Sequence, residues 1–191
     1  KKLVLWDWFF CVLVVKIGAM KGQKMKIVVL PIRPYTQVNN YECGLACTQS
    51  LLDYAGHSAS RLRLKKVLGT SRDIGTPPIA IKRILRSKGV KFREKQASTV
   101  NELKAQIDKG RVALVAYQAW GSKKYFESLQ SGHYSIVFGY EKDFLWLMDP
   151  NVRGGRVRYR KGVRKIRKEV FLSRWRDEDY KKKLFDRWFL S

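Results

Sequence analysis

A single cysteine-containing stretch, residues 37–56, constrains the fold of this chain more than any other part of the sequence. Gly44 follows Cys43, apolar residues then recur at helical spacing, and Gly56 stands where a helix would end. This pattern predicts a loop that delivers Cys43 to the N-terminus of an amphipathic helix. The unpaired backbone N–H groups and the helix dipole there lower the pKa of a thiol and populate the nucleophilic thiolate.

Two neighbours of Cys43 extend this interpretation. The side-chain amide of Gln37, six positions upstream, can form an oxyanion hole together with the backbone N–H of Cys43. Gly44 has no side chain, so the backbone there can come close to a substrate. The alternative is that Cys43 is a small buried residue at a helix start, which a cysteine taken alone favours.

A nucleophilic cysteine needs a base, and the sequence holds two histidines, His57 and His133. His57 follows the expected helix end, roughly 20 Å along the axis from Cys43 at about 1.5 Å per residue, and is interpreted as a solvated loop residue. His133 opens a run of β-branched and aromatic residues over 133–140, and a second apolar run covers 144–148. Two such runs around a short polar break predict a β-hairpin.

The predicted hairpin places a carboxylate beside His133. With its turn centred in the polar break, His133 at the start of one strand lies opposite Asp149 at the end of the other, to within one residue. Directly opposed residues have Cβ atoms about 4.5–5.5 Å apart, within reach for a carboxylate to orient an imidazole. The sequence therefore predicts Cys43 as nucleophile, His133 as general base, Asp149 as orienting group and Gln37 as oxyanion donor.

Four stretches around these residues form a combined pattern: Gln37, Glu42-Cys43-Gly44-Leu45-Ala46-Cys47, Gly132-His133-Tyr134-Ser135-Ile136-Val137 and Met148-Asp149-Pro150. Together they resemble the motif set of the bacteriocin-processing cysteine peptidases, papain-like enzymes that cut double-glycine leaders and have stand-alone relatives. The resemblance spans residues 34–150 and extends weakly over 171–177, FLSRWRD. Glu42 stands where that family usually has Asp, and Leu45 where Pro or Val is common.

The resemblance implies a papain-like α+β fold with the cysteine helix packed on an antiparallel sheet. It implies a thiol hydrolase that cuts a peptide or another amide bond, after small residues such as Gly-Gly, with no metal or organic cofactor. The partner is then a peptide or protein substrate, and the candidate substrate-binding residues are Gly44, Trp120 and Gly132. Trp120 lies in a predicted loop over 118–131, where aromatic side chains either line a groove or pack on the sheet.

The remaining sequence predicts one domain over residues 26–191. A strand over 26–30 precedes the cysteine helix. Further helices are expected over residues 61–68 behind a Ser60 cap, from Pro77 to Gly89 with Ile79 on the buried face, and from Thr99 to Gly110. Strands are expected over 90–95 and 112–117, and the C-terminal aromatic residues are expected to pack on the core. Helices that come first and strands that come later indicate an α+β arrangement.

Residues 1–25 form a separate N-terminal segment. Its apolar run over 3–15 contains Asp7 and is shorter than the roughly 20 residues of a membrane-spanning helix, although it has the length of a signal-peptide core. A signal-like, an interfacial and a non-native segment all stay open. Translation from Met20 or Met25 favours a cytoplasmic protein, whereas a native segment favours a secreted or membrane-associated one.

The three cysteines, Cys11, Cys43 and Cys47, make no disulfide framework. Cys43 and Cys47 are four residues apart on one helix face, without the Cys-x2-Cys spacing and the fourth ligand of a structural zinc site. No metal is therefore predicted, and Cys47 is expected to be a buried helix residue.

The chain is strongly basic, with a formal net charge of +24. Residues 153–168 hold nine Lys or Arg and no acidic residue, which predicts nonspecific binding of polyanions; no motif predicts a specific nucleic-acid partner. Gly154-Gly155 is a candidate self-cleavage site. A catalytically silent basic binding module and a thiol acyltransferase stay open as alternatives to a peptidase, and a monomer is expected.

Overall fold

The structure is a computed structural model that describes residues 13–16, 26–152 and 162–191. Most of the predicted N-terminal segment lies outside the described residues. Residues 153–161 of the basic run, with Gly154-Gly155, also lie outside them. Among the described residues, none of the helices combines the length and the apolar character needed to cross a membrane.

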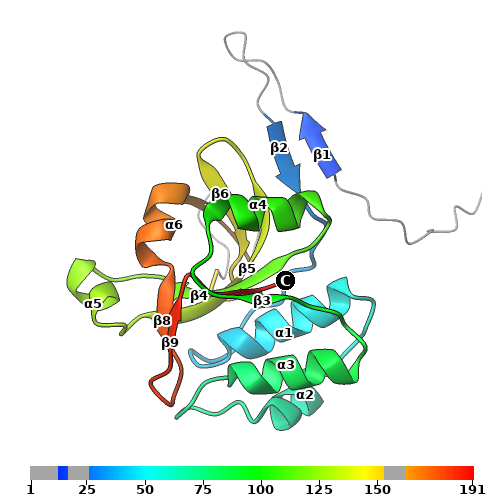
Figure 1. The fold of residues 1–191 in the computed structure, drawn as a ribbon. Coiled ribbons are helices and arrows are strands. Elements are labelled where there is room, and N and C mark those ends of the chain that lie inside the picture. The colour runs from blue at the N-terminus through cyan, green and yellow to red at the C-terminus, as the bar shows by residue number, and fades with distance from the viewer. Residues whose placement is uncertain (1–12, 17–25, 153–161) are drawn as a thin grey trace, which may run out of the picture.

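An antiparallel sheet forms the centre of the fold (Figure 1). Its strands lie in the order β1 (Leu13–Lys16), β2 (Lys26–Val29), β5 (Gly132–Tyr140), β4 (Ala113–Gln118), β10 (Phe189–Leu190) and β3 (Glu94–Lys95). β5 also pairs with β6 (Phe144–Met148), which pairs in turn with β7 (Val163–Arg167). A separate pair is formed by β8 (Arg176–Glu178) and β9 (Leu184–Asp186). Every residue of β4 is buried, so this strand is central to the core.

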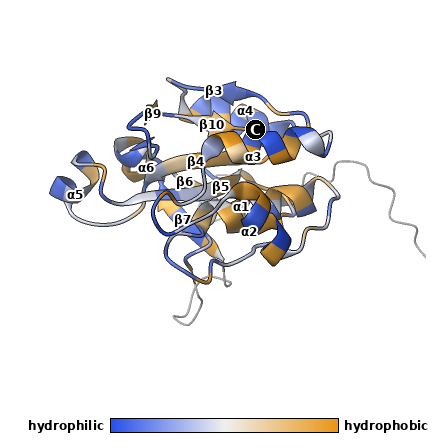
Figure 2. Ribbon diagram, turned by 90° about the horizontal axis from the view of Figure 1, so that it is seen from below, coloured by the Kyte–Doolittle hydropathy of each residue, from blue (hydrophilic) through white to orange (hydrophobic). Residues whose placement is uncertain are grey.

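The helices pack around this sheet. They are α1 (Cys43–Tyr54), α2 (Arg61–Leu68), α3 (Pro78–Ser87), α4 (Val100–Asp108), α5 (Lys123–Glu127) and α6 (Lys168–Arg174). Figure 1 shows α1, α2 and α3 gathered on one side of the molecule, and in Figure 2 α1 carries mainly hydrophobic residues. The α+β class, the cysteine helix on an antiparallel sheet and the β5–β6 hairpin are confirmed.

Three local predictions need correction. Ile79 is 60% exposed, because the inward face of α3 is formed by Ala80, Ile81 and Leu85. The strand expected over 90–95 covers only Glu94–Lys95 (β3), because its partner β10 is two residues long. The loop expected over 118–131 contains the short helix α5.

The C-terminal aromatic residues are buried in the core, as the sequence predicted. Trp175 donates its indole N–H to the carbonyl of Trp188 at 2.9 Å, and Trp188 donates its own to Glu94 Oε1 at 3.0 Å. The chain end thereby enters the sheet as β10, between β4 and β3. This insertion holds the C-terminal segment close to the start of β5, where β8 also lies.

Helix caps give a test of the fold. Thr99 and Glu102 form a reciprocal capping box at α4, whereas Ser60 occupies the N-cap position of α2 without a side-chain cap bond. Thr99→Ala should therefore lower the free energy of unfolding by about 1 kcal/mol, measured by urea denaturation. The matched Ser60→Ala change should stay within about 0.5 kcal/mol of the parent protein. Equal losses in both variants would contradict the cap assignment.

Candidate active site

The N-terminus of α1 places Cys43 against β5. A Cβ atom built on Gly44 would lie 2.6 Å from Thr76 Cβ and 3.0 Å from a ring carbon of Tyr134, so only glycine allows α1 to approach this closely. Gly44 is itself buried. Close packing against Thr76 and Tyr134 therefore requires a glycine here, and the role of Gly44 in substrate binding stays a prediction.

Glu42 fixes the loop before Cys43. Its buried carboxylate accepts hydrogen bonds from the backbone N–H groups of Val38 and Asn39 at 3.3 and 3.1 Å. The same carboxylate forms ion pairs with Arg61 and Lys65 of α2. Burial alone would raise the pKa of Glu42, but the bonds from Lys65 and Asn39 and the charge of Arg61 lower it to about 2.

The Gln37 loop is tied to the region of Asp149. Gln37 is buried, and its backbone N–H donates to the carbonyl of Pro150 at 2.9 Å. Within the described part of the chain, the side-chain Oε1 of Gln37 has no hydrogen-bond partner. A buried glutamine whose side-chain carbonyl oxygen has no donor thus lies in the loop that leads into α1.

His133 and Asp149 form a direct buried contact. His133 Nε2 lies 2.8 Å from Asp149 Oδ1, and the two residues are 2% and 1% exposed. Because Nε2 faces the carboxylate, Nδ1 is the ring nitrogen left for the hydrogen bond that links His133 with the Cys43 thiol. The structure therefore brings Cys43, His133 and Asp149 into one chain of hydrogen bonds.

The register of the hairpin differs from the sequence prediction. Ile136 pairs with Met148, so the register continues to Asp149 opposite Ser135, two residues from His133. The turn follows Glu141 and lies further along the chain than expected, which moves the partner of His133 past Asp149. A register shift between Val137 and Gly139 reduces this displacement by one residue. His133 and Ser135 share a face of β5, and a diagonal neighbour remains within side-chain reach.

Asp149 has further partners that the sequence did not reveal. Its Oδ1 accepts the backbone N–H of Asn151 at 3.0 Å, and its Oδ2 lies 3.4 Å from Arg164 Nη1. Burial opposes ionisation, but the bond and charge of His133, the Asn151 amide and Arg164 lower the pKa of Asp149 below its ordinary value. Arg164 lies within the basic run. Its role depends on the pairing of β7 with β6, which no local sequence pattern indicates.

The pKa values of Cys43 and His133 shift in opposite directions. For Cys43, burial raises the pKa, but the hydrogen bond and charge of His133, with backbone bonds from Tyr134 and Gly44, lower it below its ordinary value. For His133, burial lowers the pKa, but its bonds with Asp149 and Cys43 raise it to about 9. This arrangement favours a thiolate–imidazolium pair.

Trp120 lies over the imidazole. The ring centroids of Trp120 and His133 are 4.9 Å apart at an interplanar angle of 53°, while Trp120 remains 43% exposed. One face of the indole therefore covers the imidazole of His133, and the rest of the indole is exposed to solvent. An aromatic surface in this position can contact a bound chain.

Gly132 lies against a second buried carboxylate. A Cβ atom on Gly132 would lie 2.5 Å from Asp177 Oδ1. Gln118 links the two segments, because its Nε2 donates to Asp177 Oδ1 at 2.9 Å and its Oε1 accepts the backbone N–H of Ser131 at 2.8 Å. Burial raises the pKa of Asp177 to about 7. This cluster fixes the start of β5, directly before His133.

The two remaining residues considered as nucleophile, base or metal ligand, Cys47 and His57, form no part of this chain of hydrogen bonds. Cys47 is buried, and its thiol donates to the carbonyl of Tyr134 at 3.4 Å. His57 lies beyond the C-terminal end of α1, where its backbone N–H donates to Leu52. In the part of the chain that the structure describes, no group of three or more His, Cys, Asp and Glu side chains could hold a metal ion.

Solved structures share this fold. The peptidase domain of Streptococcus ComA, a bifunctional ABC transporter of a quorum-sensing pathway, is 19% identical with a TM-score of 0.59, over 84% of this chain and 96% of that domain. A double-glycine-motif protease from an AMS/PCAT transporter, solved with its leader peptide, is 18% identical with a TM-score of 0.55, over 85% and 91%.

A protein from Bacillus anthracis described as a C39-like peptidase is 13% identical with a TM-score of 0.59, over 78% of this chain and 92% of that one. Comparison with curated protein sequences found no match. The sequence model of the Peptidase C39 family matches residues 32–178, from the loop before Gln37 to β8. Since this match covers most of the chain and includes both Cys43 and His133, the chain belongs to the Peptidase C39 family.

Proposed function

We propose that this protein is a cysteine peptidase that uses Cys43, His133 and Asp149 as its catalytic groups. The observation that supports the proposal most directly is the buried 2.8 Å bond between His133 and Asp149, made while the same imidazole is hydrogen-bonded to a thiol at a helix N-terminus. The alternative of a catalytically silent module gives no reason for this arrangement, because burying an ionised pair costs free energy.

The reaction begins at the thiolate of Cys43. The sulfur attacks the scissile carbonyl carbon, and the carbonyl π electrons move to oxygen, where the Cys43 backbone N–H and the Gln37 amide stabilise the oxyanion. The imidazolium of His133 donates its Nδ1 proton to the leaving amine as the C–N bond breaks. Water then attacks the thioester and gives a proton to the neutral His133; the C–S bond breaks, the acid leaves, and the thiolate–imidazolium pair is restored.

Asp149 keeps the imidazole oriented. Its bond to Nε2 holds Nδ1 toward Cys43 and stabilises the positive charge that the ring carries before it donates its proton. Trp120 shields the ring from water on one side and offers a contact surface to the bound chain. Gly132, the first residue of β5 and the neighbour of His133, is a proposed contact of the bound substrate.

A peptide with Gly-Gly before the scissile bond is the proposed substrate. This chain shares its fold with a double-glycine-motif protease that was solved with its leader peptide, which supports a substrate of the same kind. Release of two peptides distinguishes hydrolysis from the acyl transfer of a related transferase, which would join the acyl group to an added amine. Mass spectrometry of the products separates the two outcomes.

Thiol alkylation tests whether the Cys43–His133 pair is assembled. Iodoacetamide should label Cys43 well below the ordinary thiol pKa of about 8.5, because the pKa of Cys43 is lowered. Cys47 should stay unlabelled in the folded protein, since burial raises its pKa. Peptide mass spectrometry reads both sites. Equal, slow labelling of the two cysteines would contradict an activated thiol.

Substitutions test the assigned roles. Cys43→Ala and His133→Ala should each lower kcat about 10⁶-fold, whereas Asp149→Ala should retain about a hundredfold more activity than either. Gln37→Ala should lower kcat roughly 10²- to 10³-fold through loss of an oxyanion donor. His57→Ala is the matched histidine control and should keep full activity. Unchanged turnover in the His133 variant would contradict the assignment.

The pH dependence of kcat/KM follows from the shifted pKa values of Cys43 and His133. The reactive ion pair exists above the lowered pKa of Cys43 and below the pKa of His133, which is about 9, so kcat/KM should be bell-shaped with an alkaline limb near pH 9. Asp149→Ala removes a contribution that raises the pKa of His133, and its alkaline limb should move to lower pH. Initial rates at constant ionic strength measure this. An unmoved limb would contradict the role of Asp149.

A further inference from the structure

A pocket of about 330 Å³ opens beside the candidate active site, between β7 and α6. Its lining is basic and aromatic, and the residues that matter here are Trp120, Phe144, Arg164, Arg167, Val170 and Arg174, called the arginine pocket below. Among the described residues, no Asp or Glu lines it. The acidic residue of α6, Glu169, is exposed and lies outside the lining.

The guanidinium groups of the pocket are only partly neutralised. Arg164 shares Asp149 with His133. Arg174 donates to the uncharged carbonyls of Gln118 and Gly121 at 3.3 and 2.9 Å. Arg167 is exposed over the Phe144 ring at 5.2 Å, and neither it nor Arg174 forms an ion pair with any carboxylate that the structure describes. The pocket therefore presents uncompensated positive charge.

The pocket adjoins the proton-donating side of the candidate site. Trp120 lines the pocket and also covers the ring of His133. In peptide cleavage the imidazolium protonates the leaving amine, so the segment on the C-terminal side of the scissile bond lies on the imidazole side of the thiol. A chain that leaves Cys43 past His133 and Trp120 thus reaches the arginine pocket.

We propose that the arginine pocket binds an acidic side chain of the substrate on the C-terminal side of the scissile bond, so that the enzyme prefers peptides with Glu or Asp there. This inference rests on the proposed peptidase function. Guanidinium groups bind carboxylates with directed, charge-assisted hydrogen bonds. The rings of Trp120 and Phe144 supply apolar surface for the methylene groups of such a side chain.

The test compares two peptides with the same Gly-Gly site. One carries Glu residues after the cleavage site, and the other carries the isosteric Gln. The Glu peptide should show a kcat/KM roughly tenfold higher at about 0.1 M salt, and the difference should shrink as salt is added.

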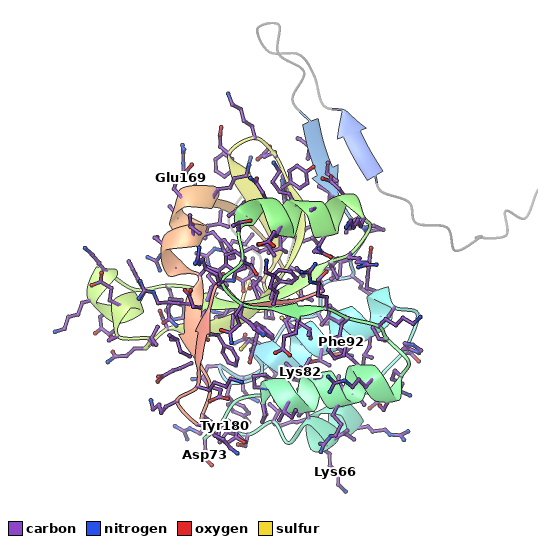
Figure 3. The ribbon with its side chains drawn as sticks, viewed as in Figure 1. Lys66, Asp73, Lys82, Phe92, Glu169 and Tyr180 are labelled. Atoms are coloured by element: carbon purple, nitrogen blue, oxygen red, sulfur yellow. The ribbon has the colours of Figure 1, made fainter. Side chains whose placement is uncertain are left out.

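Arg167→Glu should abolish the preference. Arg167 is chosen because its side chain makes no hydrogen bond to the described protein, whereas Arg164 and Arg174 hold backbone carbonyls in place. Arg63→Glu is the matched control, with the same charge change at an exposed position of α2. Figure 3 shows Glu169 of α6 and Lys66 of α2 at opposite ends of the molecule, so this control lies far from the pocket.

The outcomes separate the pocket from the proposed function. Cleavage of both peptides with equal kcat/KM would overturn the arginine pocket and leave the peptidase in place. A Glu preference that Arg63→Glu and Arg167→Glu reduce equally would assign it to the net charge of the chain and would also overturn the pocket.

If neither peptide is cleaved, fluorescence anisotropy with the same two labelled peptides gives the answer. Roughly tenfold tighter binding of the Glu peptide, lost in Arg167→Glu and kept in Arg63→Glu, would support the pocket although the proposed function had failed. Equal binding of both peptides would overturn it.

Discussion

The buried hydrogen bond between His133 and Asp149 is the interaction on which the site depends. Such a buried pair is stable only where the other lone pairs of the carboxylate oxygens also accept hydrogen bonds. Here the Asn151 amide and Arg164 supply the other contacts. Arg164 belongs to β7, and the carbonyl of Pro150, the residue after Asp149, accepts the backbone N–H of Gln37. Strand β7 and the loop before α1 therefore both contact the segment around Asp149 and Pro150. Loss of Asp149 would leave the buried His133 without its carboxylate.

The residues on either side of Cys43 position it. Glu42 closes the Gln37 loop through two backbone bonds and anchors it to α2, and its low pKa keeps the carboxylate charged. Gly44 removes the side chain that would hold α1 away from Tyr134. Glu42 is one of the two departures from the motif set that the sequence resembles. Its side chain forms the loop bonds and ion pairs, so the departure concerns support of the loop.

The sequence predicted the parts of the structure that local patterns encode. The start of α1 at Cys43, the bounds of α2 and the β5–β6 hairpin follow from periodicity and from glycine and proline positions. It did not predict the insertion of β10 between β4 and β3, nor the contact of Arg164 with Asp149. Both depend on pairing between segments far apart in the chain. The same limit explains the register error at Asp149, since one shifted pair moves every later partner.

Two arginines of the pocket are held in place by backbone carbonyls. A net charge of +24 alone would give diffuse, salt-sensitive affinity for any polyanion. The guanidinium groups of Arg164 and Arg174 are instead held by the carbonyls of Ala119, Gln118 and Gly121. Fixed guanidinium groups lose less conformational freedom on binding than free lysines. Since a guanidinium has five N–H donors, Arg164 can keep its contact with Asp149 while it meets an anion in the pocket.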